Sequence, residues 1–202
     1  MSHKPSIPLS DNLLPFDGEA FLYPDVFNSE ENKHLLQVLH EQIAWRQEAI
    51  RIFGKTVLQP RLTAWYGDEG ARYSYSGITM EPLPWISELR QLKDRAEQYA
   101  CSSFNSALLN LYRNGQDSMG WHRDNEKELG PEPVIASLSV GAARTFRFRH
   151  YQNKKHIVSL NLQPGSLLIM SGATQLHWEH QLPKTAKIAG ERINITFRTI
   201  QL

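Results

Sequence analysis

Hydrophobic residues recur at helical spacing in two stretches of the first half of the chain. In residues 35–43 leucines and an isoleucine follow this spacing, and Asn28 with Glu31 three positions later is typical of a helix start. A second stretch covers residues 84–99 and begins with a proline, a residue favoured in the first helical turn. The pattern therefore predicts two helices before Ser102.

After Ser102 hydrophobic and polar residues alternate, which is the period of a strand. Turn-forming stretches such as "RNGQDS", "QNKK" and "QPGS" separate the alternating segments. Helices followed by short strands favour a β-sandwich or barrel braced by helices, and a jelly roll, whose strands close around a pocket, fits well. The alternating segments are "SALLNLYR" (106–113), "VIASLSV" (134–140), "RTFRFRH" (144–150), "HIVSLNL" (156–162), "SLLIMS" (166–171) and "RINITFRTI" (192–200).

The composition is that of an ordinary globular protein, with 41% hydrophobic and 21% charged residues in a chain of 202. This length suits a single domain, and residues 1–18, which contain three prolines, are expected to form an irregular leader. The sequence has no long apolar run and no signal peptide, so we expect a cytoplasmic protein without a membrane partner. The single cysteine, Cys101, excludes an internal disulfide and is expected to be partly buried.

Charge is distributed unevenly, although the net charge is only +1. Residues 133–178 contain no Asp or Glu, so one side of the molecule could be positive, or these basic residues could simply form a solvated strand face. The basic residues in this range are Arg144, Arg147, Arg149, Lys154 and Lys155.

The polar stretch "GWHRDNE" (120–126) offers two metal ligands, because His122 and Asp124 at positions i and i+2 of an extended segment point the same way. An isolated H-x-D triplet is also common as a solvated turn. A third ligand could be His177 or His180 in "LHWEHQLP". Two histidines and one carboxylate leave open positions on iron, as in non-haem Fe(II) oxygenases, and zinc accepts the same ligands.

The segment "RINITFR" (192–198) places polar side chains on one face and apolar ones on the other. The polar face could lie in water or inside the barrel. In the second case Arg192 and Arg198 would need anionic partners, and a ligand with two carboxylates would supply them. Asn110 and Tyr112, which share one face of "NLYR", could point toward the same ligand.

Three motifs carry a family resemblance: "NLYRNGQDSMGWHRDNE", "WEHQLP" and "RINITFR", in this order, resemble the AlkB family of Fe(II)/2-oxoglutarate dioxygenases. "PRLTAWYGD", "YSYSGITMEPLPW" and "IASLSVGA" are similar to the family as well, so the match covers about residues 60–198. The resemblance implies a mainly β protein with flanking helices (α+β). Its double-stranded β-helix, or jelly roll, would occupy residues 102–202. Helices and a nucleotide-recognition lid would fill residues 19–101, within one domain of residues 19–202.

The resemblance also implies an activity: oxidative removal of methyl groups from DNA bases of the 1-methyladenine and 3-methylcytosine type. The reaction would use Fe(II) as its cofactor and consume O2 and 2-oxoglutarate. It would release formaldehyde, succinate and CO2. The distal histidine of the family stands two residues before an "LP"-type pair, which selects His180 over His177. The implied metal ligands are His122, Asp124 and His180. The implied 2-oxoglutarate residues are Arg192 and Tyr112 at the distal carboxylate, and Arg198, Asn110 and Asn194 at the chelating end.

On the substrate side, the resemblance implies that Tyr73 and Tyr75 of "RYSYSG" form a lid whose rings stack on a flipped base, opposite His122. An amphipathic strand would explain the two tyrosines equally simply. Phe53 in "IRIFGK" resembles a finger that enters the duplex in place of the flipped base, although the end of a buried strand would give the same pattern.

Two departures from the family bear on the substrate. Many members read "HxDDE", whereas Asn125 follows Asp124 here, so Asn125 can accept a hydrogen bond from a base but brings no charge, and Glu126 could take over that role. The loop "KTAKIAG" offers only Lys184 and Lys187 where duplex-acting members have a basic run. The preference between single and double strands therefore stays open.

Alternatives from other classes share parts of this pattern. The same chemistry could act on RNA, a protein or a small molecule, or the domain could be a non-catalytic jelly roll that binds nucleic acid. A zinc cupin with hydrolytic or isomerase activity would leave Arg192 and Arg198 unexplained. We expect a monomer whose partner is single- and double-stranded alkylated DNA, or RNA. The protein would be located at the nucleoid in a bacterium and in the nucleus in a eukaryote.

Overall fold

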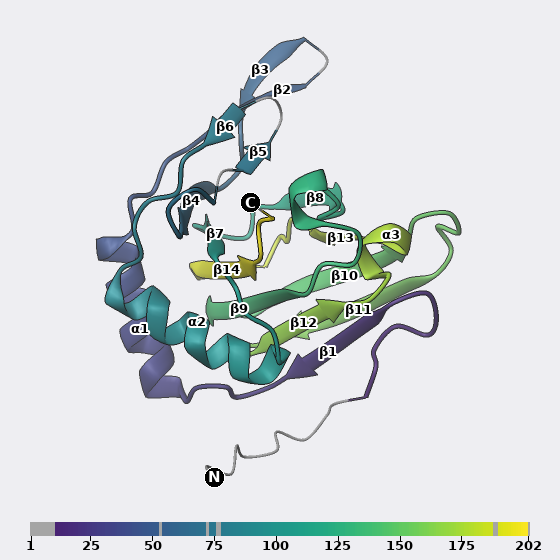
Figure 1. Ribbon diagram of the computed structural model, residues 1–202, viewed down its shortest axis with the longest axis horizontal. Helices are drawn as coiled ribbons and strands as arrows, with labels where there is room; N and C mark the ends of the chain where they lie inside the picture. The colour runs from purple at the N-terminus through teal and green to yellow at the C-terminus, as the bar shows by residue number, and fades with distance from the viewer. Residues whose placement is uncertain (1–10, 53, 72, 76–77, 188–189, 202) are drawn as a thin grey trace.

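Two antiparallel sheets form the centre of the protein. The computed structural model describes residues 11–52, 54–71, 73–75, 78–187 and 190–201 (Figure 1). The larger sheet has the strand order β1-β12-β9-β14-β7-β4, and the smaller sheet has the order β11-β10-β13-β8. No neighbours in the larger sheet are consecutive in the chain, because the chain crosses between the sheets as it does in a jelly roll. The predicted mainly β fold with flanking helices is confirmed.

The larger sheet is buried on both faces at its centre, since every residue of its strands β9 and β14 is buried. One face of β14 packs Ile193, Ile195 and Phe197 into a core shared with the helices. The opposite face is polar and is turned toward the smaller sheet. The strands are β1 (Glu19–Tyr23), β4 (Leu62–Gly67), β7 (Ser106–Tyr112), β9 (Ile135–Gly141), β12 (Leu167–Ser171) and β14 (Arg192–Arg198).

The smaller sheet closes the other side of the pocket. On β10 the aromatic rings of Phe146 and Phe148 are buried between the sheets, while Arg147 is exposed on the outer face. Each strand predicted from alternation is present, with its ends within two residues of the predicted ones. The strands of this sheet are β8 (Met119–His122), β10 (Arg144–His150), β11 (Ile157–Leu162) and β13 (Trp178–Leu182).

Two long helices, α1 (Ser29–Gln42) and α2 (Ser87–Ala100), pack against β9 of the larger sheet. The predicted capping pair is confirmed, because the Asn28 side chain accepts from the Glu31 backbone N–H and Glu31 accepts from that of Asn28. The predicted start of the second helix at Pro84 is wrong. Leu83 exchanges backbone hydrogen bonds with β4, which holds the chain extended up to Ile86.

Cys101 follows α2 in a left-handed conformation, with φ of 49°. Its predicted partial burial is wrong: the side chain is exposed, because the residue sits at the C-terminal cap of the helix, beyond the packed face. No helix in the part of the chain that the structure describes is long and apolar enough to span a membrane.

Two small hairpins project from the sheets, β2 (Ala49–Ile52) with β3 (Lys55–Leu58) and β5 (Tyr73–Tyr75) with β6 (Ile78–Met80) (Figure 1). All of β3 is exposed, so this hairpin adds no strand to the core. The larger sheet also takes β1 and β4 from residues 19–101, the range for which helices and a lid were expected.

Candidate functional site

The three candidate metal ligands meet on the smaller sheet. His122 ends β8 and pairs with His180 of β13, and their ring centroids are 4.2 Å apart. Asp124 lies just beyond β8, with Oδ1 3.9 Å from His122 Nε2 and Oδ2 4.0 Å from His180 Nε2. One ligand atom from each residue lies within 4.8 Å of the others. One metal ion could therefore contact all three residues, and the selection of His180 rather than His177 agrees with this geometry.

Both histidines direct Nε2 toward the Asp124 carboxylate. His122 Nδ1 lies 2.9 Å from the Gly120 carbonyl, so Nδ1 carries the proton and Nε2 is free to bind a metal. Burial lowers the pKa of His122, and burial together with the His122 ring lowers the pKa of His180 to about 3. Both imidazoles are therefore neutral at pH 7, which is the form that binds metal ions.

Asp124, the third candidate ligand, is ionised although it is only 3% exposed. Burial alone would raise its pKa, but the Arg198 guanidinium, with Nη2 2.8 Å from Oδ2, and the two histidine rings together outweigh burial and hold the pKa below its ordinary value. The backbone N–H of Asp124 donates to Gln175 Oε1 at 2.9 Å. The carboxylate is thus fixed through both its side chain and its backbone.

The polar face of β14 lies inside the barrel, as one of the two sequence interpretations required. Arg192, Asn194, Thr196 and Arg198 are all at most 8% exposed. One pocket contains the ligand triad together with Asn110, Tyr112 and polar residues of β14, and apolar side chains complete its wall. The polar β14 residues of this pocket are Asn194, Thr196 and Arg198, and its apolar residues include Leu108, Met119, Phe146, Met170 and Leu182.

Arg192 is fully buried without a carboxylate beside it among the described residues. Its Nη2 donates to Ser139 Oγ and Asn194 Oδ1 at 3.0 Å, while Nε and Nη1 have no hydrogen-bond partner in the described part of the chain. Burial lowers the pKa of Arg192 to about 10, so the guanidinium stays charged at pH 7. A buried cation with free donors fits an anionic ligand such as a carboxylate.

Several residues of the pocket escaped sequence reasoning. Arg61, only 7% exposed, donates from Nε to Asn110 Oδ1 at 2.8 Å. Ser137 and Ser139 of β9 hydrogen-bond the side chains of Asn194 and Arg192. Their alternation within the apolar segment "IASLSVG" is a signal that could have found the two serines, because both lie on the sheet face that carries Asn194 and Thr196 of the neighbouring β14.

The residues predicted to contact the substrate either lie away from the pocket of the triad or have side chains outside the described part of the chain. The backbone of β5 pairs Tyr73 with Met80 and Tyr75 with Ile78, but the two tyrosine side chains and Phe53 lie outside the described residues. Asn125 is exposed and Glu126 partly buried, and both line a surface hollow with Pro131 and Leu176 instead of the ligand pocket.

The basic segment 133–178 is less positive at the surface than its sequence suggested. Arg144 is buried and donates to the carbonyls of Asn114, Asp117 and Pro183. Arg149 and Lys154 both pair with Glu179, which follows the segment directly.

The segment's remaining cations are more open to solvent. Arg147 and Lys155 are exposed, and Arg149 also lies 4.1 Å from the ring centroid of Trp121. The surface there is therefore a mixed network of cations, rings and one acid instead of a purely positive patch.

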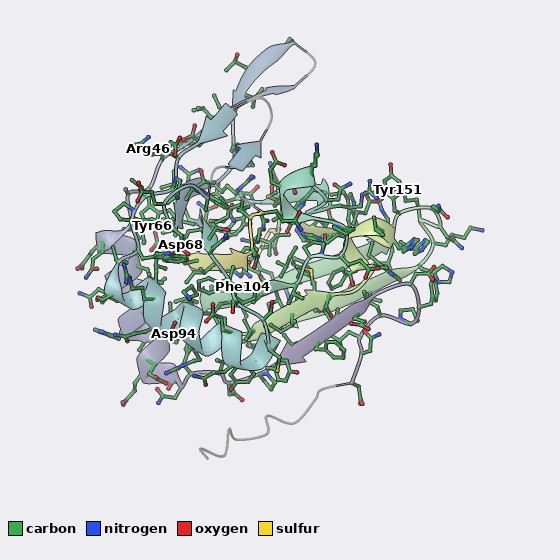
Figure 2. All side chains as sticks on the ribbon, in the orientation of Figure 1. Arg46, Tyr66, Asp68, Asp94, Phe104 and Tyr151 are labelled. Carbon is green, nitrogen blue, oxygen red and sulfur yellow. The ribbon has the colours of Figure 1, made fainter. Side chains whose placement is uncertain are left out.

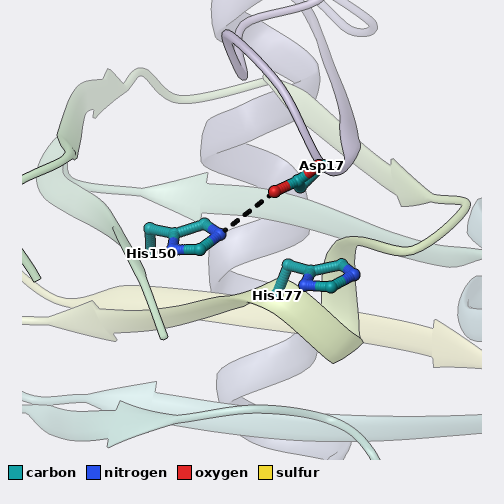
Figure 3. Close-up of side chains that lie close together, drawn as sticks. All are labelled: Asp17, His150 and His177. Carbon is teal, nitrogen blue, oxygen red and sulfur yellow. Dashed lines mark ion pairs between the residues drawn. The ribbon is translucent and has the colours of Figure 1, made fainter. Parts of the chain in front are cut away.

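A second group of possible ligands, Asp17, His150 and His177, brings its ligand atoms within 4.8 Å of one another (Figure 3). His150 Nε2 points at Asp17 Oδ2, 3.4 Å away, and the His177 ring lies parallel to that of His150. The backbone N–H of Asn153 donates to His150 Nδ1 at 3.0 Å, so the neutral ring carries its proton on Nε2. The geometry favours a polar link that holds the loop around Asp17, because a metal ion would have to displace the Nε2 proton. This link is a contact at 3.4 Å and not a formed hydrogen bond, since Nε2 has no hydrogen-bond partner in the described part of the chain.

Comparison with known proteins agrees with this geometry. The family model of the 2OG-Fe(II) oxygenase superfamily matches residues 19–198. The human alpha-ketoglutarate-dependent dioxygenase alkB homolog 3 is 45% identical over 188 residues, which cover 89% of this chain and 65% of the relative. The human DNA oxidative demethylase ALKBH2 is 39% identical over 196 residues, covering 92% of this chain and 75% of the relative.

The solved structure of OsALKBH1 has the same fold, with a TM-score of 0.66 at 14% identity, covering 89% of this chain and 97% of that one. The chain spans about 65% of the length of the alkB homolog 3 proteins that it matches from human and mouse. Family model, relatives and fold agree with the triad and the buried arginine. The chain belongs to the 2OG-Fe(II) oxygenase superfamily and, within it, to the AlkB family.

Proposed function

We propose that the protein is a DNA repair dioxygenase that oxidatively demethylates N-alkylated bases of the 1-methyladenine and 3-methylcytosine type. Fe(II), O2 and 2-oxoglutarate would be its cofactor and cosubstrates, and formaldehyde, succinate and CO2 its products. The observation that carries the proposal is a single barrel interior that contains two neutral imidazoles, the Asp124 carboxylate and a buried, charged Arg192 with free donors. A zinc hydrolase would need the triad but would have no use for the buried arginine.

His122, Asp124 and His180 are the proposed Fe(II) ligands. Two neutral imidazoles and one carboxylate suit this ion and leave positions for a chelating cosubstrate and O2. Fe(II) supplies the activation of O2 for oxidation of the methyl group. The protein's own contribution is ligand geometry: the Gly120 carbonyl fixes the tautomer of His122, and Arg198 keeps Asp124 ionised.

The proposed 2-oxoglutarate residues divide between the two ends of the molecule. Arg192 would bind the distal carboxylate through Nε and Nη1, the donors left without a protein partner, and Tyr112, whose ring lies 5.6 Å from the guanidinium carbon, would flank it. Asn110, Asn194 and Arg198 would surround the end that chelates the metal, which is supported by their place in the pocket of the triad.

DNA is the proposed substrate because the human relative named DNA oxidative demethylase aligns over 75% of its own length with nearly the whole of this chain. A base must leave the stack to reach a buried site. Tyr73 and Tyr75 would stack on the extruded base, Phe53 would fill its place in a duplex, and Asn125 and Glu126 would contact its edge. We propose activity on single- and double-stranded DNA.

The test uses protein loaded with Fe(II) under anaerobic conditions and then mixed with O2, 2-oxoglutarate and an oligonucleotide. Four methylated substrates, single- and double-stranded DNA and their RNA equivalents, are compared with unmethylated strands. We expect base demethylation and formaldehyde release with methylated DNA, and an Asp124→Ala variant should give neither. Equal or greater turnover of methylated RNA would reassign the substrate. Succinate formation that no methylated strand increases would contradict a nucleic-acid substrate.

A further inference from the structure

The short helix α3 (Thr174–His177) connects the two segments that carry the metal ligands. It leads directly into β13, where His180 lies, and its Gln175 contacts Asp124 on the other segment. Gln175 is 1% exposed, and its Oε1 accepts the backbone N–H of Asp124 at 2.9 Å, across 51 residues of sequence. This contact was not anticipated from the sequence, since the glutamine touches a backbone group and no ligand atom.

The contact matters because Asp124 lies outside any strand. β8 ends at His122, so the sheet supplies no ladder bond to the peptide that precedes the carboxylate. A buried backbone N–H requires a partner, and Gln175 is the partner it has. The orientation of this peptide sets the direction of the Asp124 side chain and hence its distance from the two imidazoles.

Further bonds hold α3 and the ligand segment together. Arg123, between the two candidate ligands, donates from Nη1 to the Leu176 carbonyl at 2.9 Å, and its guanidinium carbon lies 3.9 Å from the ring centroid of Tyr151. Tyr151 is labelled near α3 in Figure 2. Thr174 Oγ1 donates to the Ser171 carbonyl and accepts from the Glu19 backbone N–H, which ties the helix to β12 and β1. The Gln175 side chain that accepts the Asp124 N–H therefore belongs to a helix, α3, that is itself held in place by hydrogen bonds.

The amide of Gln175 is oriented by a second contact. Its Nε2 lies 3.6 Å from Met170 Sδ, and Met170 itself lines the pocket of the triad. A thioether is a weak acceptor, but it distinguishes the two ends of the amide, so the oxygen faces Asp124. The residue is therefore fixed in position and in orientation before any metal is bound.

We propose that Gln175 is a positioning residue of the metal centre, which holds the Asp124 peptide so that the three ligands converge on one ion. The inference rests on the proposed assignment of His122, Asp124 and His180 as metal ligands. Groups that orient ligands from behind typically contribute about 10- to 100-fold in metal affinity. Gln175 acts in this way through a backbone bond.

The test measures Mn(II) affinity and the Co(II) absorption spectrum of the full chain, without DNA, under anaerobic conditions. Gln175→Met keeps the length of the side chain but replaces the amide oxygen by a poor acceptor, and we expect it to weaken Mn(II) binding about 10- to 100-fold and to alter the Co(II) spectrum. Gln175→Glu retains an acceptor oxygen and should recover most of the affinity. Gln181→Met, the same change on the next strand, should bind like the wild type.

The outcomes separate this inference from the metal assignment. If wild-type protein binds Mn(II) through the triad and Gln175→Met matches its affinity and spectrum, Gln175 has no positioning role. If the wild type binds no Mn(II), or His180→Ala binds it equally well, the metal assignment itself is wrong. Should the methionine variant not fold, Gln175→Asn replaces it, because its amide ends one methylene short of Asp124, and the same loss is expected.

Discussion

The described part of the chain contains two clusters of two histidines and one aspartate, and their surroundings differ in charge and exposure. In His122, Asp124 and His180 the carboxylate is buried and ionised beside Arg198. In Asp17, His150 and His177 the carboxylate is about half exposed, with 53% side-chain accessibility. Both clusters bring one ligand atom per residue within 4.8 Å of the others. The spacing of donor atoms therefore does not distinguish a metal centre from a structural link.

The two clusters differ in the backbone groups that contact the Nδ1 atoms of their histidines. His122 donates its Nδ1 proton to the Gly120 carbonyl, which leaves Nε2 available, whereas His150 accepts the Asn153 N–H on Nδ1 and keeps its proton on Nε2. A metal needs a deprotonated lone pair, so the backbone leaves the Nε2 lone pair of His122 available and turns a protonated Nε2 of His150 toward Asp17. One backbone contact at each histidine, from Gly120 to His122 and from Asn153 to His150, thus gives the two imidazoles different tautomers.

The largest expected effect compares a histidine from each cluster. His180→Ala should lower demethylation at least about 1,000-fold, since the activation of O2 depends on the bound metal. His177→Ala, three residues away on the same segment, should stay within about twofold of wild-type activity, as surface substitutions usually do. Steady-state formaldehyde release measures both. Comparable losses in the two variants would mean that the second cluster takes part in the reaction.

A smaller effect is expected from Arg192, the buried cation beside the pocket. Arg192→Ala should weaken 2-oxoglutarate binding about 30- to 5,000-fold, because loss of one partner of a buried charge pair costs roughly 2–5 kcal/mol. Isothermal titration with Mn(II)-loaded protein measures this without turnover. Arg147→Ala, which removes an exposed guanidinium from β10, provides the control and should leave the affinity unchanged. An unchanged affinity in Arg192→Ala would remove this residue from the cosubstrate site.

The smallest effect is expected from the contact between Asp17 and His150 in the second cluster. Asp17→Ala should destabilise the protein by about 1 kcal/mol or less, because even a full ion pair with one partner half exposed contributes little. For a chain of this length that corresponds to roughly 2–4 °C or less in Tm. Thermal unfolding followed by circular dichroism gives the value. If Zn(II) raised the Tm of the wild type but not of Asp17→Ala, the second cluster would bind metal after all.

Sequence reasoning found the side chains of the pocket because they obey the parity of a strand. In "RINITFR" the apolar residues enter the core and the polar ones face the barrel interior. The same parity, applied to β10, places Arg144 with the buried rings of Phe146 and Phe148, yet the basic segment was interpreted only by its charge. Arg144 was therefore included in the predicted positive surface, although its side chain is buried and adds no charge there.

Other features of the site depend on contacts that no local pattern records. β13 is buried at Trp178, Glu179 and His180 in succession, so its sequence shows no alternation. Gln175 serves Asp124 from 51 residues away and through the backbone. The tautomers of His122 and His150 follow from single backbone groups, whose positions only the folded chain fixes. Tertiary structure therefore supplies the groups that orient the candidate ligands, although the sequence alone predicts which residues these candidates are.

The central claim is that one cluster binds the metal and the other does not. Crystals equilibrated with Mn(II) and 2-oxoglutarate, measured at the manganese absorption edge, test it directly. We predict a single anomalous peak within bonding distance of His122, Asp124 and His180, with a 2-oxoglutarate carboxylate at Arg192 and no peak between Asp17, His150 and His177. A peak in the second cluster, or none at the first, would contradict the account.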